Sequence, residues 1–517
     1  MRAYLIGLVA VTAACSQPVQ QVGVESAAPS AAAARAEAAA TITPQDFYAR
    51  IGFLASDALQ GRDTPSQGLE AAAAYIASEF YSAGLQPAGE NGTYFQRWPY
   101  VTRALDVAGV RFDVQVDGQS RSLGYRTDYY VAGGQRASFE GGLVFTGSEV
   151  PAADVRGEAL SDRAVIIAPP SAGTSQDRSR MIVRARASAD SAGAAALVVV
   201  LPAETTADDI AQAAAAAERS SRGVPSMPVF YVRSQAARSL FDAADLDFEA
   251  LTAPGGTERP VPLAGVTAQL GGGITEIEHR PPNVVAMLPG SDPQLRDTYV
   301  VFSAHIDHTG ICAPGTADPI CNGADDDASG TSAIMELAEA FASLPTAPRR
   351  SLVFLGVSGE EKGLLGSSYY ADNPTVPIEN IVANINIDMI GRNNPDSVVV
   401  IGKDYSTLGP ILERVNSQHP ELRMTTSDDI WPEQRFFFRS DHFNFARREV
   451  PAIFFFTGVH EDYHRPSDTV DKIDLDKITR IARLIFYYGN ELANADERPH
   501  WDPAGLEEVR RLVNQRR

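Results

Sequence analysis

Apolar residues recur along this chain at two spacings, one typical of helices and one typical of strands. Thr43 and Pro44 suit the start of a helix, and Phe47, Ile51 and Leu54 then follow at the spacing of one helix face. The same helical spacing predicts a second helix, and alternation further on predicts a half-buried strand. These two elements are placed at 68–83 and 110–116.

From residue 283 onward, short apolar runs alternate with helical stretches. The runs have no polar face, so they suit strands that are covered on both sides. Such alternation predicts an α/β fold, a three-layer α/β/α sandwich around a mixed, mostly parallel sheet. The predicted strands are 283–288, 299–302, 351–355, 384–387, 397–401 and 452–456, and the predicted helices are 331–344, 405–418 and 473–494.

Residues 127–275 have a different character, because short strands alternate there with connections rich in Ala, Ser and Asp. A linker rich in Gly and Pro then returns the chain to the main body. We predict an inserted small lid domain that resembles the protease-associated domain. The sequence departs from that domain at Asp162-Arg163, where many such domains carry Gly-Lys. The alternative is a separate small α/β domain that is unrelated to catalysis.

The length of the chain indicates how many domains to expect, and its net charge indicates which partners it does not bind. A chain of 517 residues exceeds what one hydrophobic core usually organises, which predicts two or three domains. The net charge of -21 leaves no basic surplus to neutralise phosphates, so nucleic acid is excluded as a partner.

The first fifteen residues have the features of a targeting segment. Arg2 supplies a short positive region, and the apolar stretch 5–11 is too short to span a bilayer as a helix. Thr12-Ala13-Ala14-Cys15 resembles a bacterial lipoprotein cleavage box, which implies a lipid on Cys15. Simple cleavage after a nearby alanine is the alternative. We therefore expect a protein of the bacterial cell envelope that meets the membrane only through this anchor, or a secreted protein.

Cys312 and Cys321 are the other two cysteines of the chain. They lie nine positions apart in a loop that contains Pro and Gly. In an oxidising compartment this spacing favours a local disulfide, which would pin the chain between His305 and Asp326. A metal site made of the two thiols is the weaker alternative.

Potential metal ligands are concentrated in the second half of the chain. Two histidines and three carboxylates can hold two divalent cations, and one further glutamate can move protons, as metal-assisted hydrolysis of an amide requires. Several of them follow predicted strands directly, at the edge where open α/β sheets bind ligands. Taken singly, each residue could instead be a helix cap, a solvated turn or an exposed acid. In chain order the set is His305, Asp326, Glu360-Glu361, Asp388 and His464.

The segments that carry these residues resemble metallopeptidase family 28, the co-catalytic zinc aminopeptidases and their carboxypeptidase relatives. The resemblance covers the loops of residues 283–495 and, more loosely, the stretch 53–62. It implies a zinc-peptidase fold, two Zn²⁺ per chain and peptide substrates.

The resemblance also implies how the two zinc ions are shared. His305 and Asp388 would hold one ion, Glu361 and His464 the other, and Asp326 would bridge both. Asp326 is chosen over its two acidic neighbours because the bridging aspartate of the family lies four residues before the glycine that corresponds to Gly330.

Three further residues receive catalytic roles from the same resemblance. Glu360 would be the general acid and base, and Asp307 would orient the imidazole of His305. Tyr463 would hydrogen-bond the developing oxyanion, or else only pack beneath His464.

Other side chains are expected near the mouth of the site. In the family a segment similar to Ser440-Asp441-His442 lies there, so Asp441 is expected to position substrate or to act from behind a ligand. Trp431 and Phe436-Phe437-Phe438 would line a side-chain pocket or pack in the core.

The predicted function is that of a zinc aminopeptidase that hydrolyses the N-terminal residue from peptides. A carboxypeptidase or dipeptidase of the same fold is the runner-up, and an inactive binding module is the remaining alternative. The predicted segments are a lipoprotein-type signal peptide at 1–15, a flexible linker at 16–42, the N-terminal part of the peptidase domain at 43–126, the inserted domain at 127–275, the di-zinc peptidase domain at 283–495 and a C-terminal tail at 496–517.

Overall fold

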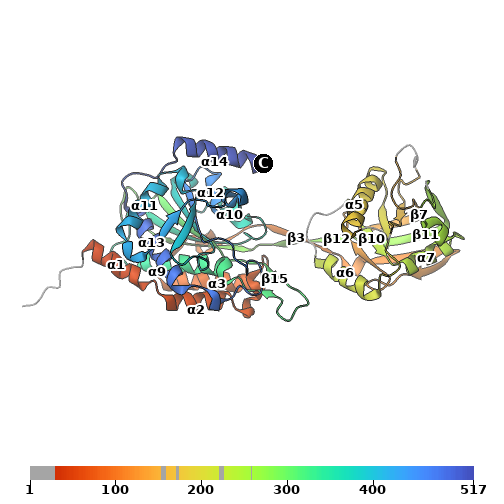
Figure 1. Cartoon of the computed structure of the whole chain (residues 1–517), viewed down its shortest axis with the longest axis horizontal. Coiled ribbons are helices and arrows are strands. Elements are labelled where there is room, and N and C mark those ends of the chain that lie inside the picture. The colour runs from red at the N-terminus through yellow and green to blue at the C-terminus, as the bar shows by residue number, and fades with distance from the viewer. Residues whose placement is uncertain (1–29, 153–158, 171–173, 220–225, 258, 517) are drawn as a thin grey trace, which may run out of the picture. The chain divides into compact units, whose positions relative to one another are not determined.

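The two ends of the chain fold together around one mixed sheet, and the middle of the chain forms a second unit (Figure 1). Among the described residues, the first unit contains those from 30 to 97 and those from Pro282 onward, and the second contains those from Trp98 to Pro281. This computed structural model describes residues 30–152, 159–170, 174–219, 226–257 and 259–516. The predicted signal peptide and Cys15 lie outside the described residues.

The sheet of the first unit is parallel at its centre, and an antiparallel pair bounds this centre on each side. Its strands follow the order β1-β13-β17-β14-β18-β21-β19-β20, and β2 also pairs with β13. The pairs among β17, β14, β18 and β21 are parallel, whereas β13 and β19 run against their inner neighbours. The strands are β1 Gln86–Pro87, β2 Phe95–Arg97, β13 Pro282–Leu288, β14 Tyr299–His305, β17 Ser351–Val357, β18 Ile381–Ile387, β19 Ser397–Ile401, β20 Thr425–Ser427 and β21 Ala452–Phe456.

Helices cover both faces of this sheet. In β14, Val300, Phe302 and Ala304 pack in one core and Val301 packs in the other, because successive side chains of a strand point to opposite faces. The predicted three-layer α/β/α fold is confirmed. The first face is covered by α1 Ala31–Thr41, α2 Pro44–Leu54, α3 Gln67–Ser82, α9 Gly330–Ala342, α11 Leu408–Gln418 and α13 Leu475–Asn494, and the second by α10 Leu365–Asp372, α12 His442–Ala446 and α14 Pro503–Arg516.

Helix α1 lies within the stretch that was predicted to be a flexible linker. The side chain of Ser30 caps its start, and Ala34, Ala38 and Ala39 are buried, with the helix packed on α9 and α13. An alanine-rich stretch has high helix propensity, and small side chains let a helix approach its neighbours closely. The linker prediction was therefore wrong for residues 31–41. At the other end of the chain, α14 occupies most of the predicted tail and buries Val509.

The second unit has its own mixed sheet with apolar cores on both faces. Its strands follow the order β5-β4-β11-β7-β8-β9-β10-β6, with parallel pairs from β7 to β10. The elements are β3 Tyr100–Leu105, β4 Arg111–Val116, β5 Gln119–Ser122, β6 Tyr129–Ala132, β7 Ser138–Phe145, β8 Ala164–Ile167, α5 Ser175–Ser191, β9 Ala196–Val200, α6 Ala207–Arg219, β10 Val229–Val232, α7 Ser234–Asp242, α8 Phe248–Thr252, β11 Val261–Gly271 and β12 Ile274–His279.

The boundaries of this unit differ from the predicted 127–275. Residues 98–126 belong to it because β4 pairs with β11, and β3 pairs with β12, across about 160 positions of sequence. Pairings between such distant segments leave no local sequence signal. The resemblance of this unit to the protease-associated domain stays a prediction. Across the described residues of the whole chain, no helix is both long enough and apolar enough to cross a membrane.

Candidate metal centre

Three neighbouring parallel strands bring the predicted ligands to one edge of the first sheet. His305 is the last residue of β14, Asp388 directly follows β18, and Glu360 and Glu361 lie in the loop after β17. Because β17, β14 and β18 are parallel neighbours, their carboxyl ends meet at the same edge. This is the edge at which open α/β sheets bind ligands.

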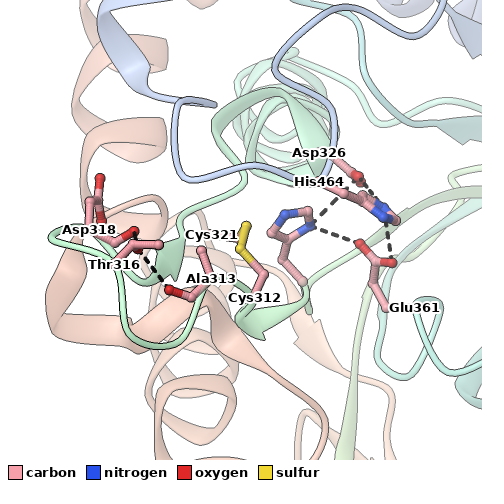
Figure 2. Close-up of a disulfide and its surroundings, with 9 residues drawn as sticks. Cys312, Ala313, Thr316, Asp318, Cys321, Asp326, Glu361 and His464 are labelled. Carbon is pink, nitrogen blue, oxygen red and sulfur yellow. Dashed lines mark hydrogen bonds and ion pairs between the residues drawn. A yellow bond between two sulfur atoms is a disulfide. The ribbon is translucent and has the colours of Figure 1, made fainter. Parts of the chain in front are cut away.

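Asp326 lies between the two histidines and presents one carboxylate oxygen to each. Its Oδ1 is 3.2 Å from Nε2 of His305, and its Oδ2 is 3.2 Å from Nε2 of His464. Nε2 of His305 also lies 3.6 Å from Oδ1 of Asp388. Nε2 of His464 lies 3.2 Å from Oε2 of Glu361. Figure 2 shows the carboxylates of Asp326 and Glu361 on either side of His464. The five residues thus form two groups that share Asp326.

These separations fit the donor set of two zinc ions. Ligand atoms placed tetrahedrally about 2.0–2.1 Å from one zinc ion lie about 3.3 Å from one another. Oδ1 of Asp388 is buried and has no hydrogen-bond partner among the described residues. A buried carboxylate oxygen must be paired or must coordinate a cation. The side chains present therefore suit one divalent cation on each side of Asp326.

Asp327 also reaches this cluster, but its carboxylate is occupied by the backbone. It accepts hydrogen bonds from the amides of His305, Gly330 and Met389, over 3.2, 2.8 and 3.1 Å. Asp327 therefore orders the chain around the ligands, and Asp326 is the member of the acidic triplet that faces both histidines.

The support of His305 differs in detail from the one that the resemblance implies. Nδ1 of His305 lies 3.1 Å from the backbone oxygen of Asp307 and 3.8 Å from its carboxylate. The carboxylate of Asp307 instead accepts from the hydroxyl of Thr64 and from the amide of Glu360. Asp307 thus orients the imidazole through its carbonyl group, and its carboxylate holds the loop that carries Glu360.

Ser440 contacts one of the predicted ligands, and Asp441 follows it in a buried position. The hydroxyl of Ser440 donates to Oδ2 of Asp388 over 2.7 Å. The side chain of Asp441 is fully buried and does not line the hollow described below, so it has no surface to offer to a substrate. Burial raises the pKa of Asp441 to about 7.

A small hollow with a cavity volume of about 30 Å³ opens over the cluster. Its polar wall contains Glu360, Tyr463 and Arg439 beside three of the ligands. Burial raises the pKa of Glu360 well above its usual range, and the nearby carboxylates of Asp441 and Asp388 raise it further, against the opposing effect of His305. The ring of Tyr463 stacks on that of His464, with 3.9 Å between centroids. Tyr463 therefore both packs on a ligand and faces the hollow.

The other residues that line the hollow are apolar. They are Met389, Phe436, Phe454, Phe456 and Val459. Of the aromatic residues that were predicted to line a pocket or to pack in the core, Phe436 lines the hollow. Trp431 lies behind it, in edge contact with Phe436 and Phe456.

His308 belongs to the cluster, although the sequence analysis gave it no role. It is fully buried, and its Nδ1 lies 2.8 Å from Oε1 of Glu361 and 3.6 Å from Oδ2 of Asp326. Its position three residues after His305 was the available signal. The predicted disulfide between Cys312 and Cys321 is also present, with 5.7 Å between the two Cα atoms (Figure 2).

Residues 283–489 match the sequence profile of peptidase family M28. Over these residues the chain is similar to peptidase family M28. The match covers all five predicted ligands and Glu360, and most of the first unit's sheet.

Individual relatives of the M28 part are similar over shorter stretches. A probable leucine aminopeptidase of Arthroderma otae is 28% identical over 245 residues, which are 45% of this chain and 65% of that protein. Leupeptin-inactivating enzyme 1 of Streptomyces exfoliatus is 28% identical over 191 residues, 37% of this chain and 38% of that enzyme. The chain thus spans less than two thirds of the length of these curated relatives.

Solved structures to which the chain is similar include an aminopeptidase from Aneurinibacillus sp. strain AM-1. It is 18% identical, with a TM-score of 0.49 over 90% of this chain and 97% of that one. The LapA aminopeptidase of Legionella pneumophila is 26% identical, with a TM-score of 0.34 over 42% of this chain and 57% of that one.

Proposed function

We propose that this protein is a zinc-dependent aminopeptidase that removes the N-terminal residue from peptides. The observation that carries the proposal is the shared position of Asp326, whose two carboxylate oxygens each lie 3.2 Å from a different histidine. A bridging carboxylate with one histidine on each side is a donor arrangement for two cations, and a glutamate that is not needed as a ligand lies beside it.

His305 and Asp388 would hold one zinc ion, and His464 and Glu361 the other, with Asp326 shared. When bound, such a pair supplies Lewis acid chemistry, which polarises a scissile carbonyl and acidifies water. The carboxylate of Glu360 would take the proton of the attacking water and return it to the leaving nitrogen. The hydroxyl of Tyr463 would donate a hydrogen bond to the oxygen on which negative charge develops.

The walls of the hollow favour the end of a peptide over its middle. The carboxylates of Glu360 and Asp388 would pair with a free α-ammonium group, which only the first residue of a peptide carries. The apolar residues that line the hollow, among them Phe436, Phe454 and Phe456, would receive the first side chain. We therefore propose leucine-like and aromatic residues as the preferred N-termini, in keeping with the similarity to a probable leucine aminopeptidase.

One observation favours a second candidate, a carboxypeptidase or dipeptidase. Arg439 lines the hollow, with its guanidinium 4.7 Å from the ring centroid of Phe436. A guanidinium at this position could bind the terminal carboxylate of a short peptide.

A matched set of peptides distinguishes these activities. A tetrapeptide that begins with leucine would be offered with a free N-terminus, with an acetylated N-terminus and with an amidated C-terminus, and released amino acids would be identified. The aminopeptidase proposal requires release of leucine from the free and the amidated peptide only. Release of the last residue from the acetylated peptide would move the assignment to a carboxypeptidase.

A further inference from the structure

We infer that Thr64, supported by Arg62, is a positioning residue that holds the Glu360 loop against the metal-binding edge. Both residues lie outside the stretch 283–489 that matches the family. The inference rests on the proposed function for its effect on turnover, but the contacts that support it do not depend on substrate.

Arg62 joins two of the segments that carry ligands. Its side chain is almost fully buried, and its guanidinium donates to backbone oxygens. Nε donates over 3.0 Å to the carbonyl oxygen of Ile306, the residue that follows His305. Nη1 donates to that of Asn322 over 2.8 Å, and Nη2 to that of Gly323 over 3.1 Å. A guanidinium has five N–H donors in a fixed plane, so it can hold several carbonyl groups at set distances. The chain before Asp326 is thereby tied to the chain after His305.

Thr64 makes the corresponding connection to the Glu360 loop. Its hydroxyl donates to Oδ2 of Asp307 over 3.0 Å and accepts from the amide of Gly359 over 3.1 Å. The other oxygen of that carboxylate accepts from the amide of Glu360 over 3.2 Å. The hydroxyl of Thr64 and the carboxylate of Asp307 therefore accept from two successive amides of the Glu360 loop. The position of the Glu360 backbone depends on these two hydrogen bonds.

Two further contacts fix residues 61–64 in this place. Gly61 has a φ of +67°, and a Cβ added to it would lie 2.3 Å from the backbone oxygen of Cys321. Asp63 forms an ion pair of 2.6 Å with Nζ of Lys362, which follows the Glu-Glu pair. Arg62, Asp63 and Thr64 together contact three segments around the cluster, at 306–307, 322–323 and 359–362.

The expected effect is large, because a catalytic base must sit within hydrogen-bond reach of the proton that it takes. A misplacement of about 1 Å can cost about 100-fold in rate, and loss of an outer partner of a metal site typically costs about 10- to 100-fold in affinity or activity. A side chain that only filled space would be replaced by valine without such a loss.

Three variants of the purified full chain test the inference. Thr64→Val keeps the shape but removes the hydroxyl, Thr64→Ser keeps the hydroxyl, and Thr146→Val replaces a buried threonine of the other unit as a control. We expect Thr64→Val to lower kcat about 10- to 100-fold with KM changed less than about 2-fold. Thr64→Ser should retain most of kcat, and Thr146→Val should retain all of it.

A second readout does not require activity. Amide hydrogen exchange of residues 358–361, measured by mass spectrometry, should be at least about 10-fold faster in Thr64→Val than in the wild type and unchanged in Thr146→Val. Unchanged exchange in Thr64→Val would overturn the inference, as would a Thr64→Ser variant that loses as much kcat as Thr64→Val. If Thr64→Val does not fold, Lys362→Met supplies the test, since loss of its pairing with Asp63 should also speed exchange of this loop. A wild type that cleaves no peptide while exchange responds as expected would instead refute the proposed function.

Discussion

Replacement of Ser440 by alanine should weaken zinc binding without touching any ligand. The hydroxyl of Ser440 donates to Oδ2 of Asp388 over 2.7 Å and accepts from Nδ2 of Asn386 over 2.7 Å. Asn386 in turn accepts from Ser303, which accepts from Asn384. All of these side chains are buried, so they form one chain of hydrogen bonds that ends on a proposed ligand.

The expected losses in zinc affinity and in stability follow from the two hydrogen bonds that Ser440→Ala removes. Asp388 loses the partner that fixes its second oxygen, and loss of such a partner typically costs about 10- to 100-fold in metal affinity, or about 1.4–2.7 kcal/mol. Nδ2 of Asn386 also loses its acceptor in a buried place, which should cost about 1–3 kcal/mol of unfolding free energy.

The assay is competition for zinc with a chelator of known affinity, combined with urea unfolding of the metal-free protein. Ser303→Ala is the matched control, because it breaks the same chain of hydrogen bonds two links further from Asp388. The free energy of unfolding should fall by a similar amount in both variants. Only Ser440→Ala should show the loss of about 10- to 100-fold in zinc affinity. Equal zinc affinity in Ser440→Ala and the wild type would refute the reasoning.

Three other variants have defined outcomes. Tyr463→Phe should lower kcat about 100-fold with KM nearly unchanged if its hydroxyl meets the oxyanion, and steady-state rates equal to the wild type would leave it only the packing role. Burial lowers the pKa of His442 from the usual 6.5 to about 3. Between these two pH values the unfolded chain binds a proton at this residue and the folded chain does not. The free energy of unfolding should therefore fall by up to about 1.4 kcal/mol per pH unit as the pH drops from 6.5 toward 3. His442→Phe should flatten that part of the stability profile measured by urea unfolding, and an unchanged slope would contradict the assignment. Joint replacement of Cys312 and Cys321 by serine should cost up to about 2.7 kcal/mol of unfolding free energy, as the entropy of closing a short loop predicts, and unchanged stability would show that the disulfide contributes nothing.

The sequence predicted the fold and the site best where a potential ligand directly follows an apolar run. Apolar runs without a polar face predicted the central strands, and His305, Glu360 and Asp388 were recognised because each follows such a run. Thr43 was recognised as a helix cap, and its side chain does accept from the amide of Asp46.

The features that the sequence did not reveal depend on contacts between distant segments. The alanines of helix α1 show no periodic apolar pattern and so predict a linker, yet Ala34, Ala38 and Ala39 are buried in a helix that packs on α9 and α13. The role of His308 depends on its distance to Glu361, and the contacts of Arg62 and Thr64 cross more than 240 positions of sequence. No periodicity or local spacing encodes such contacts, which arise only when the strands of the sheet align.

The most direct test of the account measures bound zinc and leucine release on the same samples as zinc is added to metal-free protein. Wild type and Glu360→Gln should both bind two zinc ions per chain, because Glu360 is not a ligand in the proposed site. Only the wild type should release leucine from a peptide with a free N-terminus, at a rate that rises with zinc occupancy. Full activity in Glu360→Gln, or in wild-type protein without metal, would contradict the account.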